Sequence, residues 1–596
     1  MSARRPSGRR AAVIAGVAAV AIVATSVLAV RPWAAPSPAR SGLAGQAAAP
    51  ADAGSASGHA TTPVDADTPI TVGLLLRMPG EAEIQPYLNA IADPASPDYA
   101  RYLDPAAFGR RFGPSDSAIE RAVRWVTAHG LRVAPVEPQR TVLLASGTGA
   151  DLERLFDVTL SQETDATGRS YRVPSAAPRI PGEIADIVEG VTGLADAIVA
   201  RPAVVPPFAD VLNGFMMPAD LRKAYDIDRL TSAGYTGDGQ SAVIVSFDTS
   251  LDADVVAWDE RTGTVNGGTV TRVPIEGGVA APGEGSVEVN LDIQTIRAIA
   301  PQADVYDYEG PWSGQTWLTM MSQIVSDGFA DVVSISWGIC EPFSQRGLLS
   351  SDGQLLRSAV DREIAAASAA GITIYVASGD WGIYDCNRGG STAASVDWPS
   401  ANPNLMSVGG TFLSVRQDGT YHSESAWEGA ASSWATGGGV STDYDRPVWQ
   451  QGLGIDPATI RRLVPDIAGP ADPEAGLLIR SSTPAGSFPW SAGGGTSQAA
   501  PFWAGLTVLV RQLAEEQGVL RTIDGRQRLG FLGPVLYELA ASPEGPGLFH
   551  DILAGGNLGE SAATGWDTST GLGSPVVTPL AQAIVEYLRT HPQTTP

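Results

Sequence analysis

A serine that follows three glycines is the residue of this chain whose surroundings most clearly indicate chemistry. Ser497 lies in the run GGGTSQAAP at residues 493–501, directly before an apolar stretch that predicts a helix over residues 499–516. A serine nucleophile needs a neighbouring base to accept its proton, and imidazole is the usual one. The chain contains only 5 His in 596 residues. If Ser497 is a nucleophile, we therefore expect its base to be another kind of side chain.

Two acidic residues are candidates for that base. Glu288 and Asp292 lie in a stretch that also carries apolar residues at helical spacing, namely Val289, Ile293, Ile296 and Ala300. This pattern predicts a half-buried helix over residues 287–300, with both acids on one face. Like charges one turn apart destabilise a helix by roughly a few tenths of a kcal/mol unless they share a proton or bind a positive group. A solvated acidic edge is the alternative to a catalytic pair.

A third acid follows a predicted strand. Asp380 comes directly after the apolar run 372–377, in the turn Ser378-Gly379-Asp380. Sites in α/β folds gather where strands end and helices begin, which is where Asp380 and Ser497 are expected. Each residue also has an ordinary alternative role, because Asp often caps a tight turn and Ser often caps a helix. Only their combination is specific.

The elements that would position these residues indicate two folded units. Beyond Met217, apolar strands alternate with helices, which predicts an α/β domain with a mainly parallel sheet covered on both faces. The expected strands are 242–247, 332–336, 372–377 and 405–408, and the expected helices are 287–300, 317–326 and 354–370. A smaller α+β unit precedes this domain, and a Pro-rich stretch at 201–207 separates the two. The smaller unit has expected strands at 70–76, near 131 and near 141, and expected helices at 81–91, 116–129 and 149–156.

The N-terminal segment predicts export from the cell. Arginines at positions 4, 5, 9 and 10 precede an apolar run over residues 11–30, and Val27-Leu28-Ala29 suits signal-peptide cleavage, so residues 1–30 predict a signal peptide. The run is close to the ~20 residues that span a bilayer, so a membrane anchor formed by residues 11–30 is the alternative. Residues 31–67 are rich in Ala, Ser, Gly and Pro and predict a flexible linker.

Composition and charge exclude some partners. Hydrophobic residues make up 44% and charged residues 17% of the chain, which is typical of a globular protein with a large core. The formal net charge of -25 repels nucleic acids and anionic membranes. We therefore expect no binding to nucleic acid.

The chain has only two cysteines, Cys340 and Cys386. In an exported protein such a pair predicts a disulfide, with two buried free thiols as the alternative. Closing a loop of this length would stabilise the fold by about 4 kcal/mol in the chain-entropy model.

Taken together, the motifs resemble those of the sedolisins, or serine-carboxyl peptidases, which combine a subtilisin-like fold with catalytic Ser, Glu and Asp. The matching segments are 217–225 (MPADLRKAY), 336–338 (SWG), 437–439 (GGG), 462–466 (RLVPD) and 495–497 (GTS). Residues 68–200 resemble the family's kumamolisin-type activation prodomain, which implies an α+β, ferredoxin-like unit. The resemblance further implies an activation linker at 201–216 and a peptidase domain at 217–590.

The resemblance assigns a role to each candidate residue. It makes Ser497 the nucleophile, Glu288 its general base, Asp292 the group that orients Glu288, and Asp380 the hydrogen-bond donor of the oxyanion hole. A carboxylate is an effective base when the working pH lies near its own pKa. Asp380 can donate to an oxyanion only while it is protonated. Both requirements imply an acidic pH optimum.

The resemblance also concerns the substrate cleft. Ser336, Trp337 and Gly338 are expected to line the cleft and to pair with an extended substrate backbone, as in strand addition, whereas a plain buried strand end is the alternative. Two departures from the family pattern concern specificity. Trp381 stands where a small residue is common, and Gln498 follows the nucleophile, so either can reshape a subsite.

One structural Ca²⁺ ion near the C-terminus is implied as well. Its expected oxygen ligands are the carboxylates of Asp551 and Asp567 and the backbone carbonyls of Ile552, Ala563 and Gly565. Ala563 stands where the family often has Gly, which still leaves a carbonyl oxygen for the ion. Without the resemblance, the two Asp are ordinary turn residues.

We therefore expect a secreted, acid-acting endopeptidase made as a zymogen, inhibited by its own prodomain and acting as a monomer on peptide or protein substrates. A neutral subtilisin-type protease is the first alternative, and it needs a His where Glu288 and Asp292 stand. His422 and His550 are the only His of the catalytic region. A catalytically inactive binding protein with a subtilisin-like fold is the second alternative, and the presence of all four candidate residues argues against it.

Overall fold

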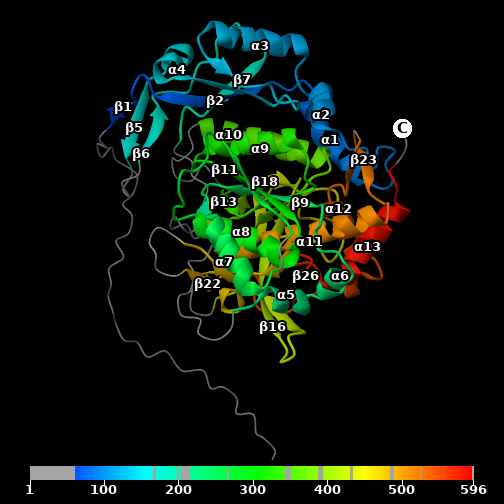
Figure 1. Cartoon of the computed structure of the whole chain (residues 1–596). Coiled ribbons are helices and arrows are strands. Elements are labelled where there is room, and N and C mark those ends of the chain that lie inside the picture. Colours follow the sequence, from blue (N-terminus) through cyan, green and yellow to red (C-terminus); the bar gives the residue numbers. More distant parts are fainter. Residues whose placement is uncertain are drawn as a thin grey trace, which may run out of the picture. The chain divides into compact units, whose positions relative to one another are not determined.

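The computed structural model describes residues 61–593, apart from internal segments at 165–169, 197–200, 203–214, 265–266, 342–350, 387–392, 430–433, 483–488 and 524 (Figure 1). The predicted signal segment 1–30 and most of the predicted linker 31–67 lie outside the described residues. The folded part begins before Thr68, because strand β1 (Thr62–Pro63) pairs with β5 (Leu160–Thr164). Among the described residues, no helix is long and apolar enough to cross a membrane.

A mostly parallel sheet is at the centre of the larger unit (Figure 1). Its eight strands follow the order β10-β11-β9-β12-β14-β16-β17, with β20 also paired to β16. The strands are β9 (Ser241–Ser246), β10 (Val270–Pro274), β11 (Asp304–Glu309), β12 (Val332–Ile335), β14 (Thr373–Ala377), β16 (Met406–Val415), β17 (Tyr421–Ala426) and β20 (Ile467–Pro470). All these pairs are parallel except β16 with β17. The predicted α/β class is confirmed.

Helices cover both faces of this sheet. The helices packed on it include α8 (Ser286–Ile299), α9 (Gly314–Asp327), α10 (Ser351–Ala369) and α11 (Thr496–Glu516). Along β9, Ile244 packs into the core that contains α8 and α11, whereas Val245 packs into the core that contains α9 and α10. Successive side chains of a strand point to opposite faces, which explains this alternation. Because both faces are buried, central strands such as β9 and β14 are mainly apolar.

Helix α8 is buried on all sides, which corrects the prediction of a half-buried helix. All 14 of its residues are buried, and Glu288 and Asp292 are 0% exposed. The helix packs against α11 and β9, and also against α7 (Asp252–Thr262) and β21 (Leu478–Arg480). The solvated-edge alternative is therefore wrong, because both acids lie in the protein interior.

The smaller unit is built around an antiparallel four-stranded sheet in the order β3-β4-β2-β7. Its strands are β2 (Pro69–Leu76), β3 (Arg132–Val133), β4 (Val142–Thr148) and β7 (Val188–Thr192). Its helices are α1 (Glu81–Ala92), α2 (Pro105–Phe112), α3 (Asp116–Ala128) and α4 (Gly149–Phe156). The sequence predicted these elements except α2, β7 and a second sheet formed by β1, β5 and β6 (Ser170–Pro174). The ferredoxin-like description stays a prediction.

Polar contacts join the smaller unit to helix α10. Arg362 of α10 forms ion pairs with Glu81 and Glu189, each at 2.6 Å. The backbone N–H of Leu103 donates to the carbonyl oxygen of Ala369 at the end of α10, at 2.7 Å. The N-terminal unit is therefore held against the helix layer of the larger unit.

A buried carboxyl group lies in the same contact. Glu363 of α10 is 0% exposed, and it accepts hydrogen bonds from Gln139 Nε2, at 3.0 Å, and from the Thr141 hydroxyl. Burial raises the pKa of Glu363 to about 7, while the bonds from Thr141 and Gln139 act to lower it. The contact therefore favours the neutral form of this acid.

Replacing Glu363 by Gln tests the cost of this burial. The ordinary pKa of the group is 4.5 and the folded value is about 7, so its ionisation opposes folding increasingly as the pH rises from about 4.5 to 7. In a Ser497→Ala background, which removes the predicted nucleophile, we expect Glu363→Gln to leave the thermal midpoint unchanged at pH ~4 and to stabilise the chain by up to ~3 kcal/mol at pH ~8.

Thermal unfolding of both proteins at the two pH values measures this effect. Glu183→Gln, which removes an exposed acid of the smaller unit, is the control and should give no such difference. Equal destabilisation by Glu363→Gln at both pH values would contradict the argument.

Candidate active site

Five residues that are far apart in the sequence meet at the N-terminus of α11. Ser497 is the second residue of α11, Glu288 and Asp292 lie on α8, Asp380 follows β14, and Ser336 connects β12 to β13 (Trp337–Cys340). All five side chains are buried, with at most 1% of each exposed. The structure thus brings together the four residues that the sequence predicts to be catalytic.

Ser497 does not cap its helix. The N-cap position is Gly495, whose φ of 81° lies in the left-handed region that favours glycine. Ser497 is therefore inside the first turn of α11, with its Oγ 3.5 Å from the carbonyl oxygen of Ser336. The next residue, Gln498, accepts from the backbone N–H of Leu477 and donates to the carbonyl of Pro470, each at 3.1 Å. Gln498 holds the glycine-rich turn, so it is not free to shape a subsite.

Ser336 links the acidic pair to the serine. Its hydroxyl donates to Asp292 Oδ1 at 2.7 Å and lies 3.2 Å from the carbonyl oxygen of Ser497. The hydroxyl thereby fixes the rotamer of Asp292 and the approach of α11 to the end of β12. Ser336 is thus a positioning residue in addition to its predicted place beside the substrate.

Burial controls the charge of the acidic pair. Desolvation, the charge of Asp292 and the charge of Asp380 raise the pKa of Glu288 well above its ordinary value, while the hydroxyls of Ser497 and Ser336 lower it. Desolvation also raises the pKa of Asp292. Neither carboxyl oxygen of Glu288 has a hydrogen bond of normal geometry among the described residues, although Ser497 is near enough to affect its pKa. Two such groups do not both ionise readily, so the pair retains a proton.

Asp380 is held by the helix that carries Ser497. Its Oδ1 accepts two hydrogen bonds from Thr496, from the backbone N–H at 2.8 Å and from the hydroxyl at 2.9 Å. The Thr496 hydroxyl also bonds the backbone of Gly379, so Asp380 is not a local turn cap. Because both Thr496 donors engage Oδ1, a proton on this carboxyl group belongs on Oδ2. Trp381 follows Asp380 and packs beside Trp434, with ring centroids 5.9 Å apart.

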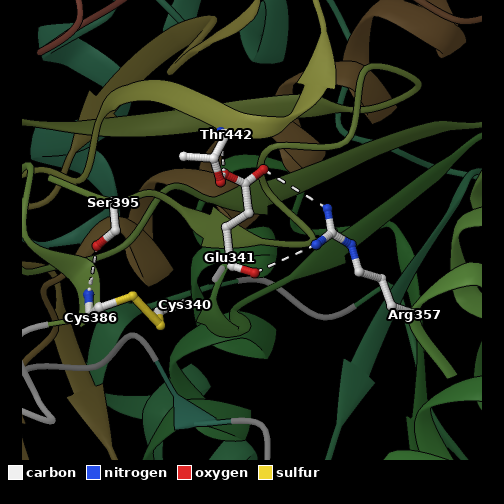
Figure 2. The surroundings of a disulfide bond; sticks show 6 residues. All are labelled: Cys340, Glu341, Arg357, Cys386, Ser395 and Thr442. Carbon is white, nitrogen blue, oxygen red and sulfur yellow. Dashed lines mark hydrogen bonds and ion pairs between the residues drawn. A yellow bond between two sulfur atoms is a disulfide. The ribbon is translucent and has the colours of Figure 1, made fainter. Parts of the chain in front are cut away.

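The predicted disulfide between Cys340 and Cys386 is present (Figure 2). Cys340 ends β13, and Cys386 lies six residues beyond Asp380, with 5.1 Å between their Cα atoms. The neighbouring Glu341 accepts from the backbone N–H of Thr442 at 2.8 Å and lies 3.9 Å from Arg357 (Figure 2). The cross-link therefore ties β13 to the segment that carries Asp380.

The edge of β13 is paired with the chain's own connecting segment. Strand β8 (Arg201–Pro202) lies antiparallel to it, with Pro202 opposite Trp337 and Arg201 opposite Gly338. These two residues come from the predicted activation linker, and residues 203–214 lie outside the described part. The backbone edge that the sequence predicts for substrate binding can thus accept an extended chain.

The predicted calcium ligands lie in two loops that contact each other. The backbone N–H of Gly565 donates to Asp551 Oδ1 at 3.1 Å, and that of Ala563 donates to Asp567 Oδ2 at 2.9 Å. Burial raises the pKa of Asp567, whereas backbone hydrogen bonds lower it. The described residues contain no cluster of three or more His, Cys, Asp or Glu side chains suited to a metal. Two carboxylates completed by backbone carbonyls, such as that of Ile552, still make a hard oxygen set that fits Ca²⁺.

Histidine is absent from the site within the described part of the chain. His422 lies exposed on β17, and His550 stacks on Tyr421 with ring centroids 3.7 Å apart. Burial lowers the pKa of His550 to about 4. Neither ring forms a hydrogen bond with Ser497 in the described contacts, so no imidazole replaces Glu288.

Two residues of this region were not identified from the sequence. Thr496 holds Asp380, and Asp307 of β11 is a fully buried acid whose charge raises the pKa of Asp292. The sequence of β11, DVYDYE, was not predicted as a strand because it contains three acids. An acid at the centre of an otherwise aromatic and aliphatic run is the signal that could have found Asp307.

Comparison with known proteins agrees with this geometry. Residues 57–197 match the family model "Pro-kumamolisin, activation domain", and residues 263–523 match the model "Subtilase family". The chain is 30% identical to sedolisin from Pseudomonas sp. (strain 101) over 529 residues, which cover 85% of each chain. It is 30% identical to kumamolisin from Bacillus sp. (strain MN-32) over 553 residues, covering 88% of this chain and 93% of the relative.

A more distant relative and a solved structure extend the comparison. Tripeptidyl-peptidase 1 from Bos taurus is 23% identical, covering 86% of this chain and 91% of that protein. The structure of Pseudomonas sedolisin complexed with two molecules of pseudo-iodotyrostatin superposes with a TM-score of 0.54 at 29% identity, covering 63% of this chain and 98% of that chain. The catalytic domain therefore shares its fold with a serine-carboxyl proteinase.

Thr496 offers a direct test of how Asp380 is held. Thr496→Val keeps the shape of the side chain and removes the hydroxyl that donates to Asp380 Oδ1. We expect about a tenfold lower kcat on a peptide substrate with KM little changed, which corresponds to ~1.4 kcal/mol.

Thr507→Val is the matched control, because Thr507 is another buried hydroxyl on α11 that bonds Trp503 and Tyr375 instead. Steady-state kinetics of the two activated variants make the comparison. Equal activity in Thr496→Val and Thr507→Val would show that the Thr496 hydroxyl has no special role.

Proposed function

The chain belongs to the sedolisin family of serine-carboxyl peptidases, and we propose that it is a secreted, acid-acting endopeptidase made as a zymogen. It is a serine-type peptidase that carries an activation prodomain. The observation that carries the proposal is the convergence of Ser497, Glu288, Asp292 and Asp380 in a buried site that contains no histidine among the described residues. Peptide or protein chains are the proposed substrates, and the monomer is the proposed active form.

In the proposed reaction, Ser497 Oγ attacks the carbonyl carbon of the scissile peptide bond while Glu288 accepts the hydroxyl proton. The carbonyl oxygen becomes negatively charged and receives a hydrogen bond from protonated Asp380. Glu288 then passes its proton to the leaving amine, and the peptide bond breaks to give an acyl-enzyme. A water molecule attacks the acyl group, Glu288 accepts a proton from it, and the acid product leaves as Ser497 regains its hydrogen.

The acidic optimum follows from the protons that this reaction requires. Glu288 must be ionised to act as a base, and because two neighbouring buried carboxyl groups do not both ionise readily, Asp292 must keep a proton. Burial raises the pKa of both groups, and the charge of Asp292 further raises that of Glu288, which favours this singly protonated pair. Rising pH removes the shared proton and the proton on Asp380, so activity should fall toward alkaline solution.

The zymogen proposal is supported by the position of β8. Arg201 and Pro202 pair with the edge of β13 that we propose for substrate binding, so the connecting segment competes with substrate for this edge. Cleavage within residues 203–216 would release that competition. Export is supported by the arginine-rich apolar start of the sequence and by the Cys340–Cys386 disulfide, which is typical of exported proteins.

Two single substitutions test the proposed catalytic pair. Ser497→Ala removes the nucleophile, and Glu288→Gln removes the base while keeping its size. We expect each to reduce peptide hydrolysis at pH ~4 by at least about a thousandfold. Release of fragments from a protein substrate, followed by mass spectrometry, is the measurement.

Glu284→Gln is the control, because Glu284 is an exposed acid one turn before Glu288. Substantial activity in either active-site variant would sink the mechanism, and absence of activity in the wild-type chain after cleavage of the linker would favour the inactive binding protein. A maximum at neutral pH would indicate a different base.

We also propose one structural Ca²⁺ ion at Asp551 and Asp567, with the carbonyls of Ile552, Ala563 and Gly565. An ion that binds only the folded state raises the free energy of unfolding by its binding free energy. Chelation should therefore lower the thermal midpoint by several degrees, and Asp551→Asn should abolish this response. A wild-type midpoint that does not respond to chelator or added Ca²⁺ would count against the ion.

A further inference from the structure

Another acid, Asp307, lies near the Glu288–Asp292 pair, on the side of the sheet that faces α8. Val305 of β11 packs into the core shared with α8, whereas Tyr308 packs into the core on the opposite face. Because side chains alternate along a strand, Asp307 points to the same side as Val305. Its backbone neighbours are Ile244 on β9 and Arg272 on β10, and its side chain is 0% exposed. Asp307 is therefore sealed between the sheet and α8.

Unpartnered oxygen atoms are concentrated in this layer. On α8, positions 288, 292 and 295 share one helical face. On the sheet, the strand neighbours of Ser246, Asp307 and Ser334 pack into the core on the opposite face, so these three side chains point toward α8. Among the described residues, these buried atoms have no hydrogen-bond partner: Glu288 Oε1 and Oε2, Asp292 Oδ2, Thr295 Oγ1, Ser246 Oγ, Asp307 Oδ1 and Oδ2, and Ser334 Oγ. Leaving a buried polar group unsatisfied costs about 1–3 kcal/mol, so a folded protein that keeps such a set indicates a functional reason.

Charged groups around Asp307 come from every neighbouring element. Asp292 faces it from α8, Glu309 from its own strand, Asp248 from the end of β9 and Arg272 from β10. Burial raises the pKa of Asp307 to about 7, helped by Glu309 and Asp248 and opposed by Arg272. The Ser246 hydroxyl also lowers this pKa, although it does not reach hydrogen-bond geometry. The charge of Asp307 in turn raises the pKa of Asp292.

We propose that Asp307 is a positioning residue of the peptidase, which holds the shared proton on the Glu288–Asp292 pair from behind. It touches neither the substrate nor Ser497 and acts only through Asp292. Once Asp307 carries a negative charge, loss of the last proton from the pair would place like charges together in a buried layer. Asp307 therefore extends the pH range over which the pair keeps one proton, its active form, toward neutral pH. This inference rests on the proposed function, because it presumes that Glu288 is the base.

Asp307→Asn keeps the side-chain shape and removes the charge, so the alkaline limb of the pH profile of kcat/KM should move to lower pH. We expect activity equal to wild type at the acidic end and about tenfold lower on the alkaline limb, with KM unchanged. Asp307→Glu, which keeps the charge, should restore the wild-type limb. A purely structural residue would instead lower activity by the same factor at every pH.

Two further variants keep the proposal testable if Asp307→Asn does not fold. Ser246→Ala removes a hydroxyl that favours ionisation of Asp307, so it should shift the same limb in the same direction by a smaller amount. Tyr306→Phe, on the opposite face of β11, should shift nothing. The inference would be overturned if wild type, Asp307→Asn and Ser246→Ala had the same alkaline limb while Glu288→Gln was inactive. That result would leave the proposed function intact. Activity in Glu288→Gln would overturn the proposed function itself.

Discussion

The carboxylate base of this site, Glu288, must carry its negative charge while buried in the protein interior. Glu288 and Asp292 are 0% exposed on a helix that is buried over its whole length. Removing a carboxylate from water is costly, so these groups keep protons that exposed acids would lose, unless nearby donors stabilise the charge. The Ser336 hydroxyl is such a donor for Asp292. The proton count of the site is therefore set by how α8 is packed, before any substrate binds.

The same constraint explains why the parts of the site are tied together so firmly. Thr496 fixes Asp380 to the start of α11, and Ser336 fixes Asp292 to the end of β12. The disulfide then joins β13 to the segment after Asp380. Because of these contacts, a shift of α11 would displace Ser497, the oxyanion donor Asp380 and the edge of β13 together. Catalysis is sensitive to small displacements of reacting groups, so the contacts favour a fixed arrangement. With few donors available, catalysis by carboxyl groups depends on this fixed geometry.

The sequence predicted the residues of the site better than their surroundings. Ser497, Glu288, Asp292 and Asp380 could be named because their motifs resemble those of the sedolisins. The burial of α8 could not be predicted, because a periodicity argument treats polar residues such as Asn290 and Gln294 as solvent-facing. In the structure Gln294 donates to Asn290 Oδ1 and to the backbone carbonyl of Arg480. Strand β11 was missed for the same reason, since Asp307 is polar but sealed. Sequence patterns report which residues prefer water, and at this site the fold overrides that preference.

Burial also governs the contact between the prodomain and α10, with an unexpected consequence for activation. Acid protonates Glu363 and so removes the cost of keeping it under the prodomain, which means that acid does not loosen this part of the contact. Arg362 on the same helix also forms ion pairs with Glu81 and Glu189. For Glu363, a fall in pH alone is therefore no signal for release of the prodomain. Cutting the segment that follows β8 removes the covalent link between the two units, and we infer that this step makes activation irreversible.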